Sequence, residues 1–157
     1  MLENVNMNPR IHENTFKKVY FNGAKGLVFL GDKILIYRRD NNTTNNPERI
    51  DLPGGGREGD ESPFETFQRE TKEEFGIDIK EDEIEFSCTI PSVIEPGKKS
   101  FFLVAKTSRI KPEDVVFGNE GIEWMMMSPS EFIEKSDGIK RQQERVKKYL
   151  AAELVSK

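Results

Sequence analysis

The sequence predicts an α+β fold in which helices lie on the faces of a mixed β-sheet. Two β-rich segments separated by a Gly-Asp pair come first, a well-capped helix follows, and further β-rich segments lead to a helical tail. No internal repeat interrupts this order. The chain has 157 residues, enough for one hydrophobic core, so residues 1–157 are expected to form a single domain.

The N-terminal part of the chain divides into an arm, a hairpin and a loop. Residues 1–15 are polar, Asn-rich and without periodicity, which predicts a loose arm or an edge strand added late. Residues 26–30 and 33–39 are β-rich and are joined by a Gly-Asp turn, so they predict a hairpin. Residues 40–47 have almost no apolar content and predict a surface loop.

A helix is expected over residues 63–75. Ser62 and Glu65 form a capping-box pattern around a proline at the first helical position, and Gly76 is suited to a left-handed C-terminal cap. Helical spacing relates the apolar positions that should pack on the sheet, with one threonine among them: Phe64, Phe67, Thr71 and Phe75.

Later strands are expected at residues 84–90, 100–105 and 123–127. Ser128 repeats the helix-start chemistry, and residues 139–155 predict a C-terminal helix. The apolar stripe of this helix comprises Val146, Tyr149, Leu150 and Leu154.

Composition excludes several classes of function. No apolar segment approaches the roughly 20 residues of a membrane-spanning helix, and the first residues do not resemble a secretory signal. The net charge of −4 argues against a general nucleic-acid-binding protein, although a small phosphorylated ligand remains compatible if a divalent cation supplies positive charge. Cys88 is the single cysteine and is expected to be a buried thiol, which fits a reducing, cytoplasmic location.

Three glutamates crowd one face of the expected helix. Glu70, Glu73 and Glu74 fall within an arc of about 100°. Like charges at this spacing cost about 0.2–0.5 kcal/mol per pair in an isolated helix. One interpretation is a solvated acidic face balanced by Arg69 and Lys72. The other is a set of ligands for a hard divalent cation, which the neighbouring apolar face favours because it brings the carboxylates to the body of the protein.

The spacing around these glutamates resembles the Nudix hydrolase signature, G-x5-E-x7-R-E-U-x-E-E-x-G-U, in which U is a bulky aliphatic residue. The fixed positions, between residues 55 and 77, are occupied by Gly55, Glu61, Arg69, Glu70, Glu73, Glu74, Gly76 and Ile77. Thr71 departs from the aliphatic residue of the pattern, and it must bury or satisfy a hydroxyl, so we expect some loss of packing. Residues 52–56, Leu-Pro-Gly-Gly-Gly, also resemble the family's usual lead-in to this signature.

The resemblance implies a Nudix fold, an α/β/α sandwich, and metal-dependent hydrolysis of a pyrophosphate bond. It implies that Glu70 and Glu74 bind Mg²⁺ or Mn²⁺ directly, with the Gly55 carbonyl as a further ligand. It assigns Glu61 and Arg69 to a structural pair that holds loop to helix, with a second-metal role for Glu61 as the alternative.

The general base is left open between two residues. The resemblance gives Glu73 a role in assisting the ion or the attacking water. In this family a loop before the late strand sometimes supplies a further glutamate, and Glu120 stands at that place between glycines 118 and 121. We expect Glu73 to act as the base with Glu120 assisting, and a plain turn residue is the alternative for Glu120.

Arginines are the candidates for substrate phosphate. Arg38, Arg39 and Arg57 are able to make bidentate contacts with phosphate oxygens. Neighbouring strand positions face opposite sides, so Arg38 and Arg39 cannot share one cleft unless the strand ends there. One of these two is therefore expected to bind substrate, and the sequence does not say which.

The substrate is expected to be a small molecule containing a nucleoside diphosphate linked to another group. Nucleoside triphosphates, ADP-ribose, other nucleotide sugars and diadenosine polyphosphates all remain open, and so does a homodimer. Pro91 resembles a proline that marks the family's ADP-ribose group, although it is equally suited to ending a strand. Four aromatic residues are candidates for stacking on a base, with core packing as the alternative: Phe86, Phe101, Phe102 and Trp124.

Two other classes of function compete with hydrolysis. A Nudix-fold binding or sensor module for a phosphorylated metabolite would typically have lost signature glutamates, and none is missing here. A protein-interaction domain with an incidental acidic helix would not explain the glycine loop and the spacing together.

Overall fold

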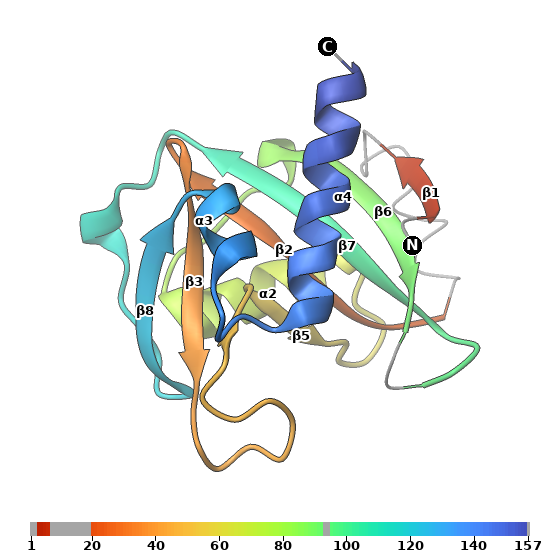
Figure 1. Ribbon diagram of the computed structural model, residues 1–157. Helices are drawn as coiled ribbons and strands as arrows, with labels where there is room; N and C mark the ends of the chain where they lie inside the picture. Colours follow the sequence, from red (N-terminus) through yellow and green to blue (C-terminus); the bar gives the residue numbers. More distant parts are fainter. Residues whose placement is uncertain (1–2, 7–19, 93–94, 157) are drawn as a thin grey trace.

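One β-sheet organises the chain (Figure 1). The structure is a computed structural model that describes residues 3–6, 20–92 and 95–156. The sheet has eight strands, with the order β1-β6-β7-β2-β3-β4, while β5 pairs with β2 and β8 pairs with β3. The strands are β1 (Glu3–Asn6), β2 (Phe21–Leu30), β3 (Lys33–Arg39), β4 (Ile50–Asp51), β5 (Gly54–Gly56), β6 (Ile84–Pro91), β7 (Lys99–Thr107) and β8 (Gly121–Met127).

Helices cover both faces of this sheet, as predicted. Helix α2 (Pro63–Phe75) lies behind the sheet in Figure 1, and α3 (Pro129–Glu134) and α4 (Lys140–Ser156) lie in front of it. Short 3-10 turns, η2 (Glu81–Glu83) and η3 (Pro112–Asp114), precede β6 and β8. Each face has its own buried cluster, one containing Phe67 and Phe75 of α2 and the other containing Val146 and Tyr149 of α4. The mixed sheet therefore lies between two helical layers.

The predicted hairpin is present, and its first strand is longer than expected. Strands β2 and β3 pair on either side of Gly31, whose φ of +71° is accessible to glycine without strain. Strand β2 begins at Phe21 because its first half, too polar and glycine-containing to indicate a strand by alternation, pairs antiparallel with β5 and parallel with β7. This extension brings the glycines of β5 against the body of the sheet.

Helix α2 begins and ends as the sequence predicts. The Ser62 side chain accepts a hydrogen bond from the Glu65 backbone, and the Glu65 side chain accepts one from the Ser62 backbone. Gly76 closes the helix with φ +68° and donates its backbone N–H to the Lys72 carbonyl. Capping at both ends fixes the length of α2 and hence the positions of its glutamates.

Two expectations for the ends of the chain need revision. The apolar stripe of α4 stops at Leu150, because Leu154 is 77% exposed and the last turns extend beyond the sheet (Figure 1). Of the N-terminal arm, residues 3–6 form β1, which pairs with β6 at the end of the strand order, as the edge-strand alternative required. The rest of residues 1–15 lies outside the described part of the chain.

Cys88 is a buried free thiol on β6, as predicted. Burial raises its pKa to about 12. The thiol is therefore uncharged at neutral pH and packs with the apolar residues on the α4 side of the sheet.

Candidate active site

The strand β5 is built of three glycines, and the side chain of Glu70 uses the space that they leave. A Cβ atom added to Gly55 would lie 2.6 Å from Glu70 Oε1. A Cβ added to Gly56 would meet nothing closer than the Asn22 carbonyl oxygen, at 3.9 Å. The absence of a side chain at Gly55 therefore lets the Glu70 carboxylate rest directly on the β5 backbone.

Three carboxylates meet beside this contact. One oxygen each from Glu70, Glu73 and Glu120 lies within 4.8 Å of the others, and we call these three residues the acidic cluster. Glu70 is partly buried, and the other two are exposed. Burial is the first cause that raises the pKa of Glu70; Arg69 opposes the shift, and the charges of Glu73 and Glu120 add to it.

Glu120 reaches the acidic cluster because its loop caps the C-terminal end of α2. The backbone N–H of Val116 donates to the Phe75 carbonyl at 2.9 Å, and that of Gly118 donates to the Glu74 carbonyl at 2.9 Å. These bonds satisfy carbonyls that a helix end leaves without partners. A Cβ on Gly118 would clash with the Glu73 carbonyl oxygen, so glycine permits the close approach that the sequence suggested.

Glu61 and Arg69 form the ion pair that the sequence predicted. Arg69 Nε donates to Glu61 Oε2 at 2.8 Å, and Arg69 Nη2 donates to the Gly56 carbonyl at 2.7 Å. Burial alone would raise the pKa of Glu61, but hydrogen bonds from Arg69, the Glu58 backbone and Thr66 lower it overall. The pair thus joins β5 and the following loop to α2. Arg69 Nη1 also contacts two members of the acidic cluster, Glu70 at 3.1 Å and Glu73 at 3.3 Å.

Glu74 lies apart from the acidic cluster. Its side chain is buried, and Oε1 accepts a hydrogen bond from the Gly54 backbone N–H at 3.0 Å. Burial raises the pKa of Glu74 to about 8, against the opposing charge of Lys25 and the bond from Gly54. The role of Glu74 as a direct metal ligand stays a prediction, as does that of the Gly55 carbonyl.

The two neighbouring arginines of β3 point in different directions. Arg38 contacts Glu123 and Asp137, each at 2.8 Å. Arg39 instead binds the buried Asp51, with Nη1 3.1 Å from Oδ2, and it lines two cavities near the acidic cluster. Of the two arginines between which the sequence did not choose, the geometry therefore favours Arg39 as the substrate contact.

Arg57 is held away from these cavities. Its Nε donates to the Glu61 carbonyl at 2.8 Å, and its guanidinium lies 4.3 Å from the centre of the Phe21 ring. These contacts give Arg57 a place in the loop after β5. Its predicted contact with substrate remains a prediction.

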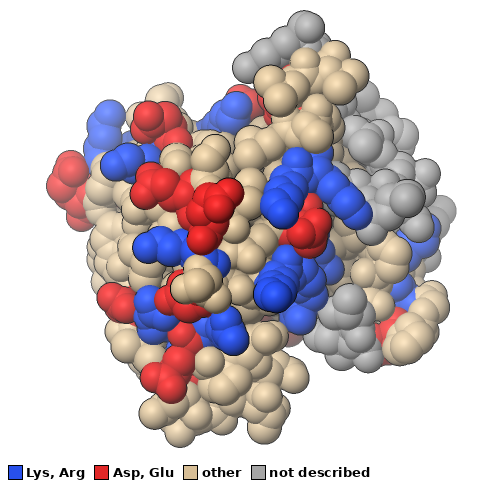
Figure 2. Space-filling view, in the orientation of Figure 1, with Lys and Arg blue, Asp and Glu red and all other residues tan. Residues whose placement is uncertain are grey.

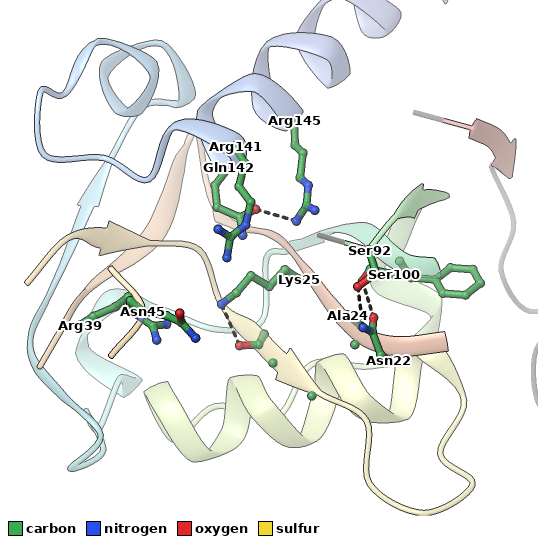
Figure 3. A pocket seen from close by; sticks show the side chains of 15 residues that line it. Asn22, Ala24, Lys25, Arg39, Asn45, Ser92, Ser100, Arg141, Gln142 and Arg145 are labelled. Carbon is green, nitrogen blue, oxygen red and sulfur yellow. Dashed lines mark hydrogen bonds between the residues drawn. The ribbon is translucent and has the colours of Figure 1, made fainter. Parts of the chain in front are cut away.

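Two cavities open beside the acidic cluster. One of about 460 Å³ is lined by Glu120, Arg39, Tyr37 and the neighbouring loop. The other, of about 210 Å³, lies between β5 and α4 (Figure 3). Arg39 lines both cavities, so its side chain forms part of the wall of each.

Several residues of the smaller cavity were not predicted from the sequence. Lys25 Nζ lies 3.0 Å from Asp51 Oδ2 and donates to the carbonyls of Leu52 and Gly54, each at 3.0 Å. Arg141 and Arg145 of α4 line the same cavity. Lys25 precedes the predicted strand by one residue, and the spacing of Arg141 and Arg145 by four in a predicted helix was the only signal for that pair.

The predicted stacking residues divide between core and cavity. Phe86 and Phe102 are buried and pack against Tyr149, in agreement with the core alternative. Phe101 lines the smaller cavity, although only 2% of its surface is exposed. Trp124 is partly buried against the α2-side core. Pro91 is the exposed last residue of β6.

The acidic cluster suits a hard divalent cation. Carboxylate oxygens are the donors that Mg²⁺ prefers, and three of them converge here. Arg69 pairs with Glu70 and Glu73 but is shared with Glu61, so negative charge remains in excess. The Glu70 carboxylate also occupies the space that any side chain at position 55 would need. In the part of the chain that the structure describes, no helix is both long and apolar enough to cross a membrane.

Comparisons with known proteins agree with this architecture. The NUDIX domain family model matches residues 20–150. No curated protein sequence matches the chain. Among solved structures, a MutT protein from Methanosarcina mazei Go1 is 26% identical with a TM-score of 0.61, over 83% of this chain and 95% of that chain.

Two other solved structures share the fold at lower identity. A bifunctional NMN adenylyltransferase/ADP ribose pyrophosphatase from Francisella tularensis, complexed with AMP and a manganese ion, is 16% identical with a TM-score of 0.64, over 90% of this chain and 48% of that chain. This chain thus spans about half the length of that protein. A Nudix hydrolase from Nitrosomonas europaea is 18% identical with a TM-score of 0.60, over 82% of this chain and 69% of that chain. With the family model matching most of the chain, the protein belongs to the Nudix family and is a Nudix-type hydrolase.

Proposed function

We propose that the protein hydrolyses the pyrophosphate bond of a nucleoside diphosphate linked to another group, and that the reaction requires Mg²⁺ or Mn²⁺. The observation that carries this proposal is the acidic cluster, in which Glu70, Glu73 and Glu120 converge beside Gly55. A group of carboxylates with excess negative charge, next to a cationic cavity, is suited to a metal-bound diphosphate. A cation at the cluster and arginine in the cavity would neutralise its charge from two sides.

The proposed ligands of the ion are Glu70, Glu74 and the Gly55 carbonyl, with Glu120 as a further candidate. When bound, the ion would neutralise the diphosphate and lower the pKa of an attacking water. Glu70 is supported by its place in the acidic cluster. Glu74 would have to exchange its hydrogen bond with the Gly54 backbone for a position facing the cluster.

The protein's own side chains would accept the proton, bind the phosphate and keep the site in position. Glu73 is proposed to accept the proton of the attacking water, since its exposed carboxylate belongs to the acidic cluster and is open to solvent. Glu120 would assist from the opposite loop. Arg39, which lines both cavities, would hold a phosphate oxygen and orient the diphosphate. Arg69 and Glu61 would keep β5 and α2 at a fixed separation.

The alternative is a binding or sensor module that retains the fold without turnover. It is disfavoured because every signature glutamate is present and because the Glu61–Arg69 pair and the contact of Glu70 with Gly55 are intact. The Francisella tularensis protein is an ADP ribose pyrophosphatase as well as an adenylyltransferase, which makes ADP-ribose a sensible first substrate to assay.

The test is a panel of nucleoside triphosphates, nucleotide sugars, ADP-ribose and diadenosine polyphosphates, assayed with Mg²⁺ or Mn²⁺ for released phosphate and nucleotide. The proposal expects cleavage of at least one diphosphate linkage, loss of that activity with excess chelator, and its return with added ion. Full activity in excess chelator would contradict the metal requirement. Tight binding of panel members without any cleavage would favour the sensor module.

A further inference from the structure

The smaller cavity collects positive charge from three separate elements. Lys25 comes from β2, Arg39 from β3, and Arg141 and Arg145 from α4; we call these four residues the basic pocket. Figure 3 shows their side chains converging from the two walls, with α4 above and β5 below. The pocket has a volume of about 210 Å³.

One buried carboxylate forms ion pairs with two of these cations. Asp51, 1% exposed, lies 3.0 Å from Lys25 Nζ and 3.1 Å from Arg39 Nη1 through the same oxygen. Its other oxygen accepts the backbone N–H of Leu52 at 2.7 Å. The charge of Asp51 is therefore shared, and it leaves one net positive charge on this wall of the pocket.

The two arginines of α4 have no such partner. Neither Arg141 nor Arg145 forms an ion pair with any residue that the structure describes, and Arg145 Nη1 donates only to the neutral Gln142 Oε1, at 3.1 Å. They stand one helical turn apart, where like charges repel. Burial first, and then the charge of Arg141, lower the pKa of Arg145 to about 10, and the charge of the more distant Asp51 opposes them only in part.

Helix α4 does contain an acidic residue that could have paired with these arginines. Glu144 lies on the same helix, but it pairs with Lys147 on the exposed side, at 3.3 Å. In Figure 2 basic side chains gather over the first half of α4, with a small acidic area among them. The two α4 guanidinium groups that line the cavity thus have no carboxylate within ion-pair distance among the described residues, and a phosphate suits them because pairs of its negative oxygens accept the paired N–H groups of a guanidinium.

The position of the pocket relates it to the proposed reaction. Gly54, Gly55 and Gly56 form one of its walls, and Gly55 also supports the Glu70 carboxylate. The acidic cluster and the basic pocket are therefore neighbours across Gly55, and Arg39 borders the cavity on each side. At about 210 Å³ the pocket is below the range of about 300–1,000 Å³ that holds a whole drug-sized ligand, and it suits one charged group.

We infer that the basic pocket binds a phosphate monoester that the substrate carries in addition to the diphosphate that is cleaved. The substrate class is then a nucleoside diphosphate derivative with a second phosphorylated position, on a ribose or at the end of the attached group. This inference rests on the proposed function for its connection to catalysis, while binding of phosphate by the pocket does not depend on turnover.

Binding is tested first, without metal or turnover. Inorganic phosphate is titrated into the full chain in the presence of excess chelator, and binding is followed by calorimetry. Arg145→Gln and Arg141→Gln should each raise the Kd for phosphate at least about tenfold, since each removes a charge-assisted hydrogen bond. Lys148→Gln, which removes the same charge from an exposed position of the same helix, should leave the Kd within about twofold.

Catalysis is tested second, with substrate pairs that differ by one phosphate. ADP-ribose is compared with its 2′-phosphate, and dephospho-coenzyme A with coenzyme A, and kcat/KM is measured at saturating Mg²⁺. The inference expects one phosphorylated member to be preferred at least about tenfold, and expects Arg145→Gln to remove that preference through KM. Arg145→Lys, which keeps the charge, should retain part of it, and thermal melting of each variant verifies folding.

The two tests separate failure of the inference from failure of the proposed function. Absence of hydrolysis with every substrate, while the arginine variants still weaken phosphate binding, would overturn the proposed reaction and support the phosphate site. Phosphate binding that is absent, or equal in the wild type and both arginine variants, would overturn the phosphate site whatever the activity.

Discussion

The acidic cluster and the basic pocket lie on either side of the glycine strand β5 and carry charges of opposite sign. The acidic cluster takes two glutamates from α2 and one from the loop that caps it. The basic pocket draws cations from β2, β3 and α4, with one buried carboxylate between two of them. Each region carries an excess of charge of one sign, which favours a divalent cation for the first and a phosphate for the second.

The two regions differ in how far apart in the sequence their charged residues lie. Carboxylates on one helix converge at i and i+3 without any long-range contact, whereas the cations depend on how the sheet brings its strands to α4. Gly55 touches both regions, because it supports Glu70 and forms part of the pocket wall. Substitutions on the two sides of β5 should therefore separate the requirements of chemistry from those of binding.

The largest effect is expected from Glu70→Gln, which removes a charged ligand at nearly constant volume. Turnover of a diphosphate substrate should fall by about 100-fold or more, while the melting temperature without metal changes little. Glu134→Gln makes the same chemical change at an exposed position of α3 and should leave turnover unaffected. Near-normal turnover in Glu70→Gln would place the metal elsewhere.

The acidic cluster can be divided further by comparing Glu73→Gln with Glu120→Gln at saturating metal. Loss of the general base should cost about 100-fold in kcat, so we expect that loss for Glu73→Gln. Glu120→Gln should cost about threefold to tenfold, because Glu120 assists from a loop. The opposite ranking would assign the base to Glu120.

A smaller loss is expected from Gly55→Ala. The added Cβ would lie 2.6 Å from the Glu70 carboxylate and would displace it, and a displacement of about 1 Å can cost up to about 100-fold. We expect kcat to fall about tenfold. Gly56→Ala is the matched control, since its Cβ would meet nothing closer than 3.9 Å, and it should change kcat less than about threefold. Equal effects would mean that general stiffening of β5 is responsible.

The smallest effect should come from Thr71→Val, because the Thr71 side chain is buried and belongs to neither region. Thr71 is buried, and its hydroxyl has no hydrogen-bond partner among the described residues. Valine has nearly the same shape without the unsatisfied group, so the variant should be more stable by about 1 kcal/mol in urea denaturation. Turnover should stay unchanged. A loss of stability would show that the hydroxyl has a partner in solution.

The acidic side was predictable from the sequence because its geometry is local. Helix periodicity and two caps determine where Glu70 and Glu73 lie, and the structure agrees with both caps. Glu120 was suggested by the family resemblance, which places a glutamate in the loop before the late strand, and its flanking glycines permit the close backbone approach. Glu74 illustrates the limit: periodicity places it on the correct arc, but its hydrogen bond with the Gly54 backbone depends on how β5 meets the helix.

The basic side was not predictable in the same way. Lys25, Asp51 and Arg145 are far apart in the sequence, and they converge only through strand pairing and the packing of α4. The first half of β2, where Lys25 lies, has no alternating pattern because its pairing with glycine strand β5 does not require one. The exposed end of α4 shows the same limit, since helical spacing alone cannot say where the sheet ends.

The acidic cluster is, in our proposal, the metal-dependent centre of the reaction. Crystals soaked in Mn²⁺ and measured at an anomalous wavelength would locate the ion directly. The expected result is a peak in contact with Glu70 and at least one further signature glutamate beside Gly55, absent from crystals of Glu70→Gln. A protein that hydrolyses its substrate with Mn²⁺ but shows no peak there, or shows one only at distant surface carboxylates, would contradict the proposal.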